Sequence, residues 1–395
     1  MKVVQINATC GIGSTGKICV SVSRLLSQNN IENYILYSAT GIELPNAISC
    51  SSRPYIKLQS LKSHIIGEYG FLSGKATKRI INVLNDINPD IVHLHNIHGH
   101  DCNLEMLFSY LRENKIKIFW TFHDCWAFTG YCPHYTMAGC EKWKNQCERC
   151  PQKREYTFFF DKSKKNYNRK KELLKDLDLT IITPSEWLKN QVKESFLKAY
   201  PVKVINNGID LNIFKPQTSD FRQRHGIEDK YIVLGVSFKW DERKGIDKIV
   251  EIAQKLRSNY KLVLVGADEK VKKMLPDNVI AISSTNDQKE LAEIYSASDV
   301  FINLTKEDTF PTVNIEALAC GLPVITTDAG GSPEILTNKC GTVIADTDVC
   351  KWVQTIEEVC EKRIFTKEDC IKRASAYDRD EKYKEYLQLY LSYTG

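Results

Sequence analysis

One stretch, residues 299–324, constrains the fold of this chain more than any other. An apolar run over 300–304 predicts a buried strand, and a polar loop follows it. Pro311 then begins a short helix that Gly321 and Pro323 end. A buried strand that leads through a loop into a helix is the repeating unit of parallel α/β sheets.

Two carboxylates lie on either side of this helix start. Asp308 lies in the loop and Glu316 in the helix, and helical side chains lean toward the N-terminus, so Glu316 is expected to point back toward Asp308. Between them lie the unpaired amides of the first helical turn, near Thr312, Val313 and Asn314, which form an anion site. Acids that accept hydrogen bonds from hydroxyl groups, beside amides that bind phosphate, fit a sugar joined to a diphosphate.

Elsewhere in the chain, strands alternate with helices and predict two parallel sheets. The 395 residues are enough for two domains of ~100–200 residues each. We place the first domain at 1–206, with strands over 3–6, 33–37, 90–95, 117–121, 179–183 and 202–205. We place the second at 207–376, with strands over 231–236, 262–266, 279–283, 300–304 and 324–327. A final helix, about 377–395, is expected to pack back on the first domain.

The composition excludes several classes of protein. No stretch reaches the ~18–20 consecutive apolar residues of a membrane span, and the start of the chain lacks a long apolar segment before a cleavage site, so we expect a cytoplasmic protein. The formal net charge of +5 is modest for this length, and we expect no nucleic-acid partner. Most of the 14 cysteines are expected to be reduced and buried.

A glycine-rich loop that includes Gly13 and Gly16 follows the first strand. A dinucleotide site would need an acid at the end of the next strand, which runs into Ser38 instead, and a P-loop would need a hydroxyl where Ile18 stands. In a third interpretation the small residues let the backbone approach a phosphate or another substrate group. A tight turn without a ligand is the remaining alternative.

Histidines gather at the ends of two expected strands. His93 and His95 lie on one face of the strand over 90–95, where packing and a metal site are both open. His123 and Asp124 follow the strand over 117–121, and ligands bind at the carboxyl ends of parallel strands. We therefore expect His123 and Asp124 in a functional site, the alternative being a histidine that only ends the strand.

Four cysteines follow this strand: Cys132, Cys140, Cys147 and Cys150. The last two, separated by two residues and followed by Pro151, have the spacing of half a structural zinc site, whereas the first two are irregularly spaced. A structural zinc ion, a disulfide-stapled loop and free thiols all stay open. A cytoplasmic setting favours zinc over disulfides.

Two further segments are rich in basic residues. Lys239, Arg243 and Lys244 follow the strand over 231–236 and would neutralise a diphosphate leaving group without a metal ion, unless they belong to an ordinary surface loop. Residues 153–175 combine nine Lys or Arg with three acids and five aromatic side chains, which suits an anionic membrane surface or a solvated helix face. Residues 53–79, with six basic residues against Glu68, can belong to the same surface.

Taken together, these motifs resemble the retaining glycosyltransferases of family 4 over nearly the whole chain. In the second half the resemblance rests on EALACGLPV over 316–324, on Arg243-Lys244-Gly245 and on residues 207–210; in the first half it rests on the glycine loop and on His123-Asp124. It implies the GT-B fold, which has two facing Rossmann-like α/β domains with a cleft between them. The family pairs two acids as E-x7-E, and here Asp308 takes the first position. Lys239 is the nearest match to the family's usual arginine.

The resemblance implies a metal-independent hexosyltransferase that takes a sugar from a UDP- or GDP-linked donor with retention at the anomeric carbon. The diphosphate would be held by Lys244, Lys239, Gly13, Gly16 and the amides over 312–314. Glu316 would hold the ribose of the nucleotide, and Asp308 would meet the donor sugar. His123 and Asp124 would position the sugar and the acceptor.

The cysteine-rich loop after His123 resembles bacterial enzymes of capsule, exopolysaccharide or O-antigen assembly. Those enzymes imply a lipid-linked saccharide acceptor and a peripheral location at the inner face of the cell membrane. A catalytically silent, nucleotide-sugar-binding scaffold of the same fold is the competing interpretation, and an NAD-linked oxidoreductase is the third. The sequence names neither the donor base, nor its sugar, nor the acceptor.

Overall fold

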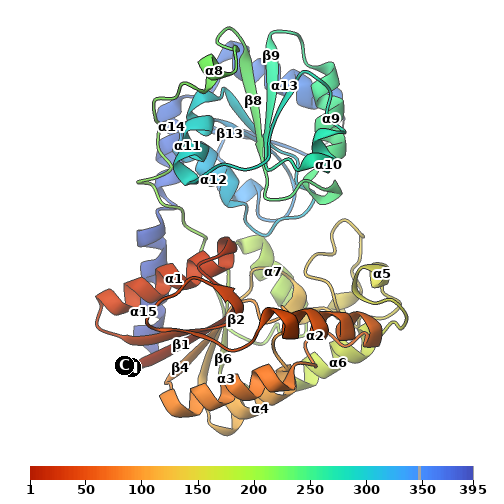
Figure 1. Cartoon of the computed structure of the whole chain (residues 1–395), viewed down its shortest axis with the longest axis vertical. Coiled ribbons are helices and arrows are strands. Elements are labelled where there is room, and N and C mark those ends of the chain that lie inside the picture. The colour runs from red at the N-terminus through yellow and green to blue at the C-terminus, as the bar shows by residue number, and fades with distance from the viewer. Residues whose placement is uncertain (346–347, 395) are drawn as a thin grey trace. The chain divides into compact units, whose positions relative to one another are not determined.

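The computed structural model describes residues 1–345 and 348–394, and these form two compact units (Figure 1). The first contains residues 1–205 and the C-terminal residues from Tyr383, and the second contains Asn206–Lys382. The division falls one residue before the expected boundary at 206, and the chain re-enters the first unit at Tyr383 rather than at 377. Each unit is built on one parallel sheet, as two Rossmann-like domains require.

The sheet of the first unit has seven strands in the order β3-β2-β1-β4-β5-β6-β7. These strands are β1 (Lys2–Cys10), β2 (Glu32–Gly41), β3 (Ala47–Ser49), β4 (Ile91–Leu94), β5 (Lys117–Thr121), β6 (Leu179–Thr183) and β7 (Val202–Val204). The helices are α1 (Gly13–Gln28), α2 (Arg53–Ile66), α3 (Gly74–Ile87), α4 (Leu104–Glu113), α5 (Lys153–Tyr156), α6 (Ser163–Leu173), α7 (Glu186–Glu194) and α15 (Arg379–Thr394). The chain order reverses beside β1, where β4 pairs with it in parallel and Val3 lies opposite Ile91. Ligand sites in such sheets form at this switch point.

Helices cover both faces of this sheet, which explains why its central strands are continuous apolar runs. On one face Ile18 of α1 and Tyr390 of α15 pack with Val3 of β1. On the other face Leu84 of α3 and Phe108 of α4 join the main core. The C-terminal helix therefore completes the first unit.

The second unit has a six-stranded parallel sheet in the order β10-β9-β8-β11-β12-β13. Its strands are β8 (Tyr231–Val236), β9 (Tyr260–Val265), β10 (Val279–Ile282), β11 (Val300–Asn303), β12 (Val324–Thr327) and β13 (Gly341–Ile344). Its helices are α8 (Phe221–Arg224), α9 (Ile246–Lys255), α10 (Glu269–Lys272), α11 (Gln288–Ala297), α12 (Thr312–Ala319), α13 (Val349–Lys362) and α14 (Lys367–Ser375). The strand β13 was not expected from the sequence. Across the described ranges, no helix combines the length and the apolar character needed to cross a membrane.

Candidate functional site

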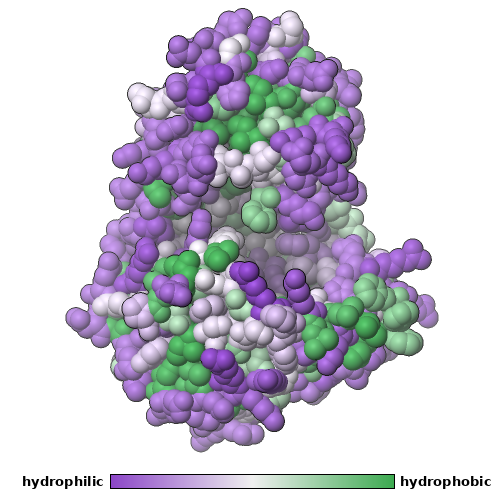
Figure 2. Space-filling model, in the orientation of Figure 1, coloured by the Kyte–Doolittle hydropathy of each residue, from purple (hydrophilic) through white to green (hydrophobic). Residues whose placement is uncertain are grey.

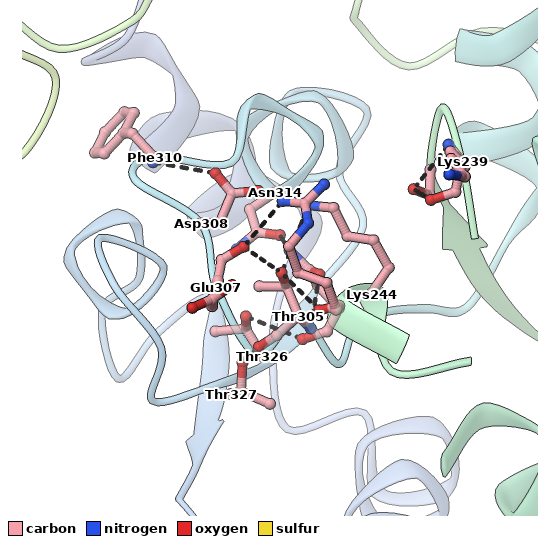
Figure 3. Close-up of polar contacts among 12 residues, drawn as sticks. Lys239, Lys244, Thr305, Glu307, Asp308, Phe310, Asn314, Thr326 and Thr327 are labelled. Atoms are coloured by element: carbon pink, nitrogen blue, oxygen red, sulfur yellow. Dashed lines mark hydrogen bonds and ion pairs between the residues drawn. The ribbon is translucent and has the colours of Figure 1, made fainter. Parts of the chain in front are cut away.

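The loop between β11 and α12 holds an acid against a lysine from another part of the second unit. Lys244 ends the short 3-10 helix η3 (Glu242–Lys244) after β8, and its Nζ atom lies 2.7 Å from Oδ2 of Asp308 (Figure 3). Both side chains are partly exposed, at 18% and 21% of their surface. The second oxygen of Asp308 accepts the backbone N–H of Phe310 at 3.2 Å. An ammonium group and a carboxylate are thus fixed side by side at the carboxyl ends of adjacent strands.

Backbone contacts keep this loop in place. The N–H of Lys306 donates to the carbonyl of Arg243 at 2.8 Å, and the hydroxyl of Thr305 donates to the carbonyl of Glu307 at 3.0 Å. Gly331, in the turn after β12, donates its N–H to the carbonyl of Asp308 at 3.1 Å. Three separate segments of the unit therefore determine where Asp308 lies.

The start of α12 is arranged partly as the sequence predicts. Pro311 is its N-cap residue, and no side chain caps the first turn. However, the N–H of Asn314 donates to the carbonyl of Pro311 at 3.2 Å, so the interpretation of this amide as an open anion donor is wrong. The side chain of Asn314 is fully buried and accepts from Asn303 at 2.8 Å. Of the three predicted residues, Thr312 and Val313 remain partly exposed.

Glu316 is oriented by a tyrosine from α11. The hydroxyl of Tyr295 donates to Oε2 of Glu316 at 3.2 Å and also lies 3.4 Å from the carbonyl of Val313. Burial, together with the charge of Glu316, raises the pKa of Tyr295 well above its ordinary value, so the tyrosine stays a neutral donor. One carboxylate oxygen of Glu316 thus has a fixed position on the first helical turns of α12.

The three predicted cations of this unit do not act as one group. Lys239 is exposed and lies apart from the Lys244–Asp308 contact in Figure 3, where its backbone N–H contacts Ser237 at 3.3 Å. The guanidinium of Arg243 donates to the carbonyl of Glu307 at 3.4 Å and so supports the loop. Lys244 is the cation that contacts the predicted donor-sugar acid.

In the first unit, a chain of histidines follows the carboxyl ends of β4 and β5. Nδ1 of His95 lies 3.1 Å from Nε2 of His123, and the two rings are stacked at 13°. Nε2 of His95 lies 3.2 Å from Oε1 of Gln5, which only accepts there, so the His95 ring must carry its proton on Nε2. His123 is then the donor in the contact between the two rings.

Burial keeps these rings neutral. It lowers the pKa of His93 to about 3 and that of His123 to about 4, and it lowers the pKa of His95 well below its ordinary value. His93 lies 2.8 Å from Thr121 and also contacts the hydroxyl of Tyr390 on α15. Both ring nitrogens of His93 are therefore used inside the protein, which favours the packing interpretation for this residue.

Asp124 pairs with a histidine from the loop after β4. Its Oδ2 lies 2.8 Å from Nε2 of His98, and its Oδ1 accepts the N–H of Trp126 at 2.9 Å. Burial raises the pKa of Asp124, but His98 outweighs burial and lowers it to about 2. Burial likewise lowers the pKa of His98, but Asp124 outweighs that effect and raises it. With His95 and His123, this charged pair lines one small pocket.

A buried lysine contacts Trp126, one of the residues that line this pocket. Lys170 of α6 is fully buried, and its Nζ donates to the carbonyls of Trp126 at 2.7 Å and Thr129 at 3.0 Å. Its ammonium also lies 3.5 Å from the centre of the Trp126 ring. Burial lowers the pKa of Lys170 to about 7. The sequence of this segment left a membrane surface and a solvated helix face open, and both are wrong for Lys170 because its side chain is buried.

The predicted glycine loop is shorter than expected, because Gly13 and Gly16 already belong to the first turn of α1. The N–H of Gly11 donates to the carbonyl of Gly16 at 3.0 Å. Gly16 is buried and a Cβ there would lie 2.8 Å from the hydroxyl of Thr9, whereas Gly13 has open space around it. Among the two predicted glycines, Gly13 is the exposed one.

The four predicted cysteines line one small pocket. All four are free thiols, so the disulfide alternative does not hold. Within 1–345 and 348–394, no three His, Cys, Asp or Glu side chains are arranged as a metal-binding group. The structure brings Cys132, Cys140, Cys147 and Cys150 together without supporting the zinc ion, which stays a prediction.

Sequence reasoning missed Tyr295, Gln5 and Tyr390 as partners of site residues. Tyr390 lies in the expected final helix and Tyr295 lies in α11, and an aromatic hydroxyl on a buried helix face needs a polar partner. This requirement could have indicated from the sequence that both hydroxyls have polar partners. Which partner each hydroxyl meets depends on the packing of distant elements.

Two family models together match most of the chain. The model described as Glycosyltransferase Family 4 matches residues 16–213, which is half of the chain, and the model described as Glycosyl transferases group 1 matches residues 217–377. Among curated proteins, the "Putative colanic acid biosynthesis glycosyl transferase WcaC" of Escherichia coli K12 is 22% identical over 99% of both chains. The N-acetyl-alpha-D-glucosaminyl L-malate synthase of Bacillus anthracis is 22% identical over 84% of this chain and 81% of its own.

Solved structures match along the full length. Sucrose-phosphate synthase from Thermosynechococcus elongatus has a TM-score of 0.71 at 18% identity and covers 100% of this chain and 99% of its own. Anabaena HepE, solved with UDP-glucose, also has a TM-score of 0.71, at 15% identity, and covers 99% of this chain and 100% of its own. At these identities the likeness shows the fold, which is GT-B.

Proposed function

This chain belongs to glycosyltransferase family 4, and from that premise we propose that it transfers a sugar from a nucleotide-diphosphate donor to a saccharide acceptor, with retention at the anomeric carbon. The contact of Lys244 with Asp308 carries the proposal, because it puts a cation and a hydrogen-bond acceptor together beside the start of α12. A similar structure, Anabaena HepE, is solved with UDP-glucose, which supports a UDP-sugar as the donor class. A GDP-sugar is the other donor that we propose to test.

In the proposed reaction, the sugar–phosphate bond breaks and negative charge builds on the departing diphosphate. The ammonium of Lys244 neutralises that charge, assisted by the amides of Thr312 and Val313. Asp308 accepts hydrogen bonds from the donor sugar. Glu316, oriented by Tyr295, accepts hydrogen bonds from the ribose hydroxyls.

The acceptor hydroxyl attacks on the face from which the diphosphate leaves, and its proton passes to the leaving phosphate. No protein base is then needed, which agrees with the neutral, internally bonded histidines of the first unit. We propose that His123 and Asp124 position the sugar and the acceptor, and that the reaction is independent of metal ions.

We propose a lipid-linked saccharide as the acceptor, in the biosynthesis of a surface polysaccharide at the inner face of the membrane. The full-length likeness to WcaC, whose name refers to colanic acid biosynthesis, supports this role. The donor and acceptor determine which polysaccharide is made.

The test begins with a thermal-shift panel of UDP-, GDP- and ADP-sugars, because a ligand that binds the folded state raises its stability. The donor that binds is then incubated with lipid-linked acceptors, and the anomeric configuration of the product is determined by NMR, with and without EDTA. We expect a retained configuration and equal rates in EDTA. Donor binding without transfer or hydrolysis would assign the chain to a nucleotide-sugar-binding scaffold. If none of the nucleotide sugars raises the melting temperature, the proposed donor site is rejected.

A further inference from the structure

The helix α2 buries polar side chains and exposes apolar ones, whereas a surface helix usually does the opposite. Its buried residues are the polar Gln59 and Ser63, whereas Leu58, Leu61 and Ile65 are 48%, 51% and 41% exposed. Residues spaced three and four positions apart lie on one face of a helix. A helix that shows its large apolar side chains to solvent has a face that a partner must cover.

A second exposed apolar segment follows α5. Phe158, Phe159 and Phe160 are consecutive, and their side chains are 60%, 61% and 63% exposed. The rings contact one another, with centroids 6.3 Å and 6.2 Å apart. Three neighbouring phenylalanines at this exposure do not contribute to the core of the unit.

The two segments form one surface. The N–H of Phe158 donates to the carbonyl of His64 near the end of α2 at 2.8 Å, and the two rings lie 5.4 Å apart. In Figure 2, hydrophobic side chains gather on the side of the first unit where Figure 1 shows α2 and α5. We name this the α2–Phe surface and define it by Leu58, Leu61, Ile65, Phe158, Phe159 and Phe160.

Two exposed lysines of α2, Lys57 and Lys62, lie beside this surface. The helix α2 contains no acidic residue, and its Lys57 and Lys62 are exposed. Among the ion pairs of the described residues, neither lysine has a partner. Unpaired ammonium groups around an exposed apolar face match the head groups of anionic lipids.

Three basic residues at the start of α6 and within it, in contrast, are occupied within the protein. Lys162, Lys165 and Arg169 all contact Glu68, at 3.2, 2.7 and 3.0 Å. Burial raises the pKa of Glu68, but these three cations outweigh it and lower the pKa to about 2. From its sequence, the segment 153–175 suits an anionic membrane surface or a solvated helix face, and the structure leaves the phenylalanines and α2 for the first of these roles.

We propose that the α2–Phe surface docks on an anionic lipid bilayer, with the phenylalanines and the leucines of α2 in the interfacial layer and Lys57 and Lys62 against lipid phosphates. The inference deepens the proposed function, because it says how the enzyme reaches a lipid-linked acceptor, but lipid binding itself requires no transfer. A protein partner or a second copy of the chain would equally cover apolar side chains. Unpaired lysines at the edge of that surface favour the lipid.

The test measures co-sedimentation of the full chain with vesicles of phosphatidylcholine containing 30% phosphatidylglycerol, and with pure phosphatidylcholine, at about 0.1 M salt. We expect binding to the anionic vesicles and at least tenfold weaker binding to the neutral ones. A variant with F158S, F159S and F160S is expected to lose anionic-vesicle binding at least tenfold. The matched control is Ile364→Ser, which removes a side chain that is 52% exposed in the second unit.

A second variant, with Lys57→Glu and Lys62→Glu, keeps the apolar side chains and is expected to lose binding to a similar extent. Failure of the parent to bind anionic vesicles, or equal binding by the parent and both variants, would overturn the proposal. A parent that is a dimer on size-exclusion chromatography, and whose phenylalanine variant is a monomer, would assign the surface to a second copy instead. The thermal shift with the donor sugar is expected to be unchanged in both variants, which separates this test from that of the proposed function.

Discussion

The Nζ atom of Lys244 lies 2.7 Å from Oδ2 of Asp308, although 64 residues separate the two in the sequence. The lysine ends a short helix after β8 and the acid lies in the loop after β11, and β8 and β11 are neighbours in the sheet. A hydroxyl of Thr305 lies 3.5 Å from the same Nζ atom. In the proposed mechanism, this pair would hold the leaving diphosphate and a sugar hydroxyl.

Replacing this lysine tests the donor site most directly. Lys244→Met keeps much of the side-chain volume but removes the charge, and we expect transfer to fall by ~10²–10³-fold, the usual loss when one electrostatic stabiliser of a transition state is removed. The measurement is kcat/KM with the donor found in the thermal-shift panel. The control Lys248→Met removes an exposed lysine of α9 that pairs with Glu251 and is expected to keep full activity. Equal activity of the two variants would remove Lys244 from the proposed mechanism.

The contact of Tyr295 with Glu316 predicts a smaller effect on binding. Tyr295→Phe removes a hydroxyl that donates to the carboxylate, and a hydrogen bond to a charged group contributes about 1.5–3 kcal/mol. Because this hydroxyl positions Glu316 and does not itself hold the ligand in the proposed site, only part of that free energy is lost from binding. We expect the dissociation constant of the nucleoside diphosphate to rise by ~2–10-fold, measured by isothermal titration calorimetry. Since the ring remains, the melting temperature should fall by only a few degrees. An unchanged affinity would mean that Glu316 needs no positioning from α11.

The neutral histidines of the first unit predict acid sensitivity. The folded-state pKa of His93 is about 3 and that of His123 about 4, both below the ordinary value near 6.5. Above pH ~6.5 these rings are neutral in both the folded and the unfolded chain, and they do not reduce the free energy of unfolding. As the pH falls toward 4, only the unfolded chain binds the protons, so the free energy of unfolding falls by up to ~1.4 kcal/mol per pH unit for each ring. His98 acts in the opposite sense, because Asp124 outweighs burial and raises its pKa, and its contribution is lost as the pH rises.

Urea unfolding at pH 7.5 and at pH 5.0 checks this prediction, with fluorescence of the tryptophans as the signal. We expect a lower midpoint at pH 5.0. A urea midpoint at pH 5.0 that is not lower than the midpoint at pH 7.5 would contradict this prediction. It would mean that the rings of His93 and His123 do not stay neutral in the folded protein.

Much of the fold could be predicted from local sequence signals. The strands β5, β6, β8 and β12 have the bounds expected for them, because each is an apolar run that a loop or helix residue ends. The strand β13 was missed, since its four residues are no continuous buried run: Gly341 and Ile344 are buried, whereas Val343 between them is exposed. Ser185, a residue type that often begins helices, caps α7 and accepts the N–H of Leu188 at 3.2 Å.

The candidate site could be predicted only in part. Asp308, Glu316, Lys244 and His123 follow from motif spacing, since each lies where a strand or a helix meets a loop. Their partners do not, because the pairing of Asp124 with His98 depends on how loops from different strands pack. Lys170 is the clearest case, since a lysine in a basic segment gives no local sign that it is fully buried against Trp126. Tertiary packing overrides composition there.

The turn after β12 provides the last prediction. Gly330 has a φ of +57°, and a Cβ at this position would lie 1.8 Å from the carbonyl oxygen of Asp308. Gly330→Ala must therefore move either the turn or the loop that holds Asp308, and we expect at least a tenfold loss of transfer as well as a lower melting temperature. The matched control is Gly226→Ala in the same unit, where φ is +61° and a Cβ meets nothing within 4 Å. Both variants lose stability because a side chain at positive φ costs of order 1–2 kcal/mol. Only Gly330→Ala also displaces Asp308, so only this variant should lose activity. Equal losses in the two would assign the effect of Gly330→Ala to general destabilisation rather than to the position of Asp308.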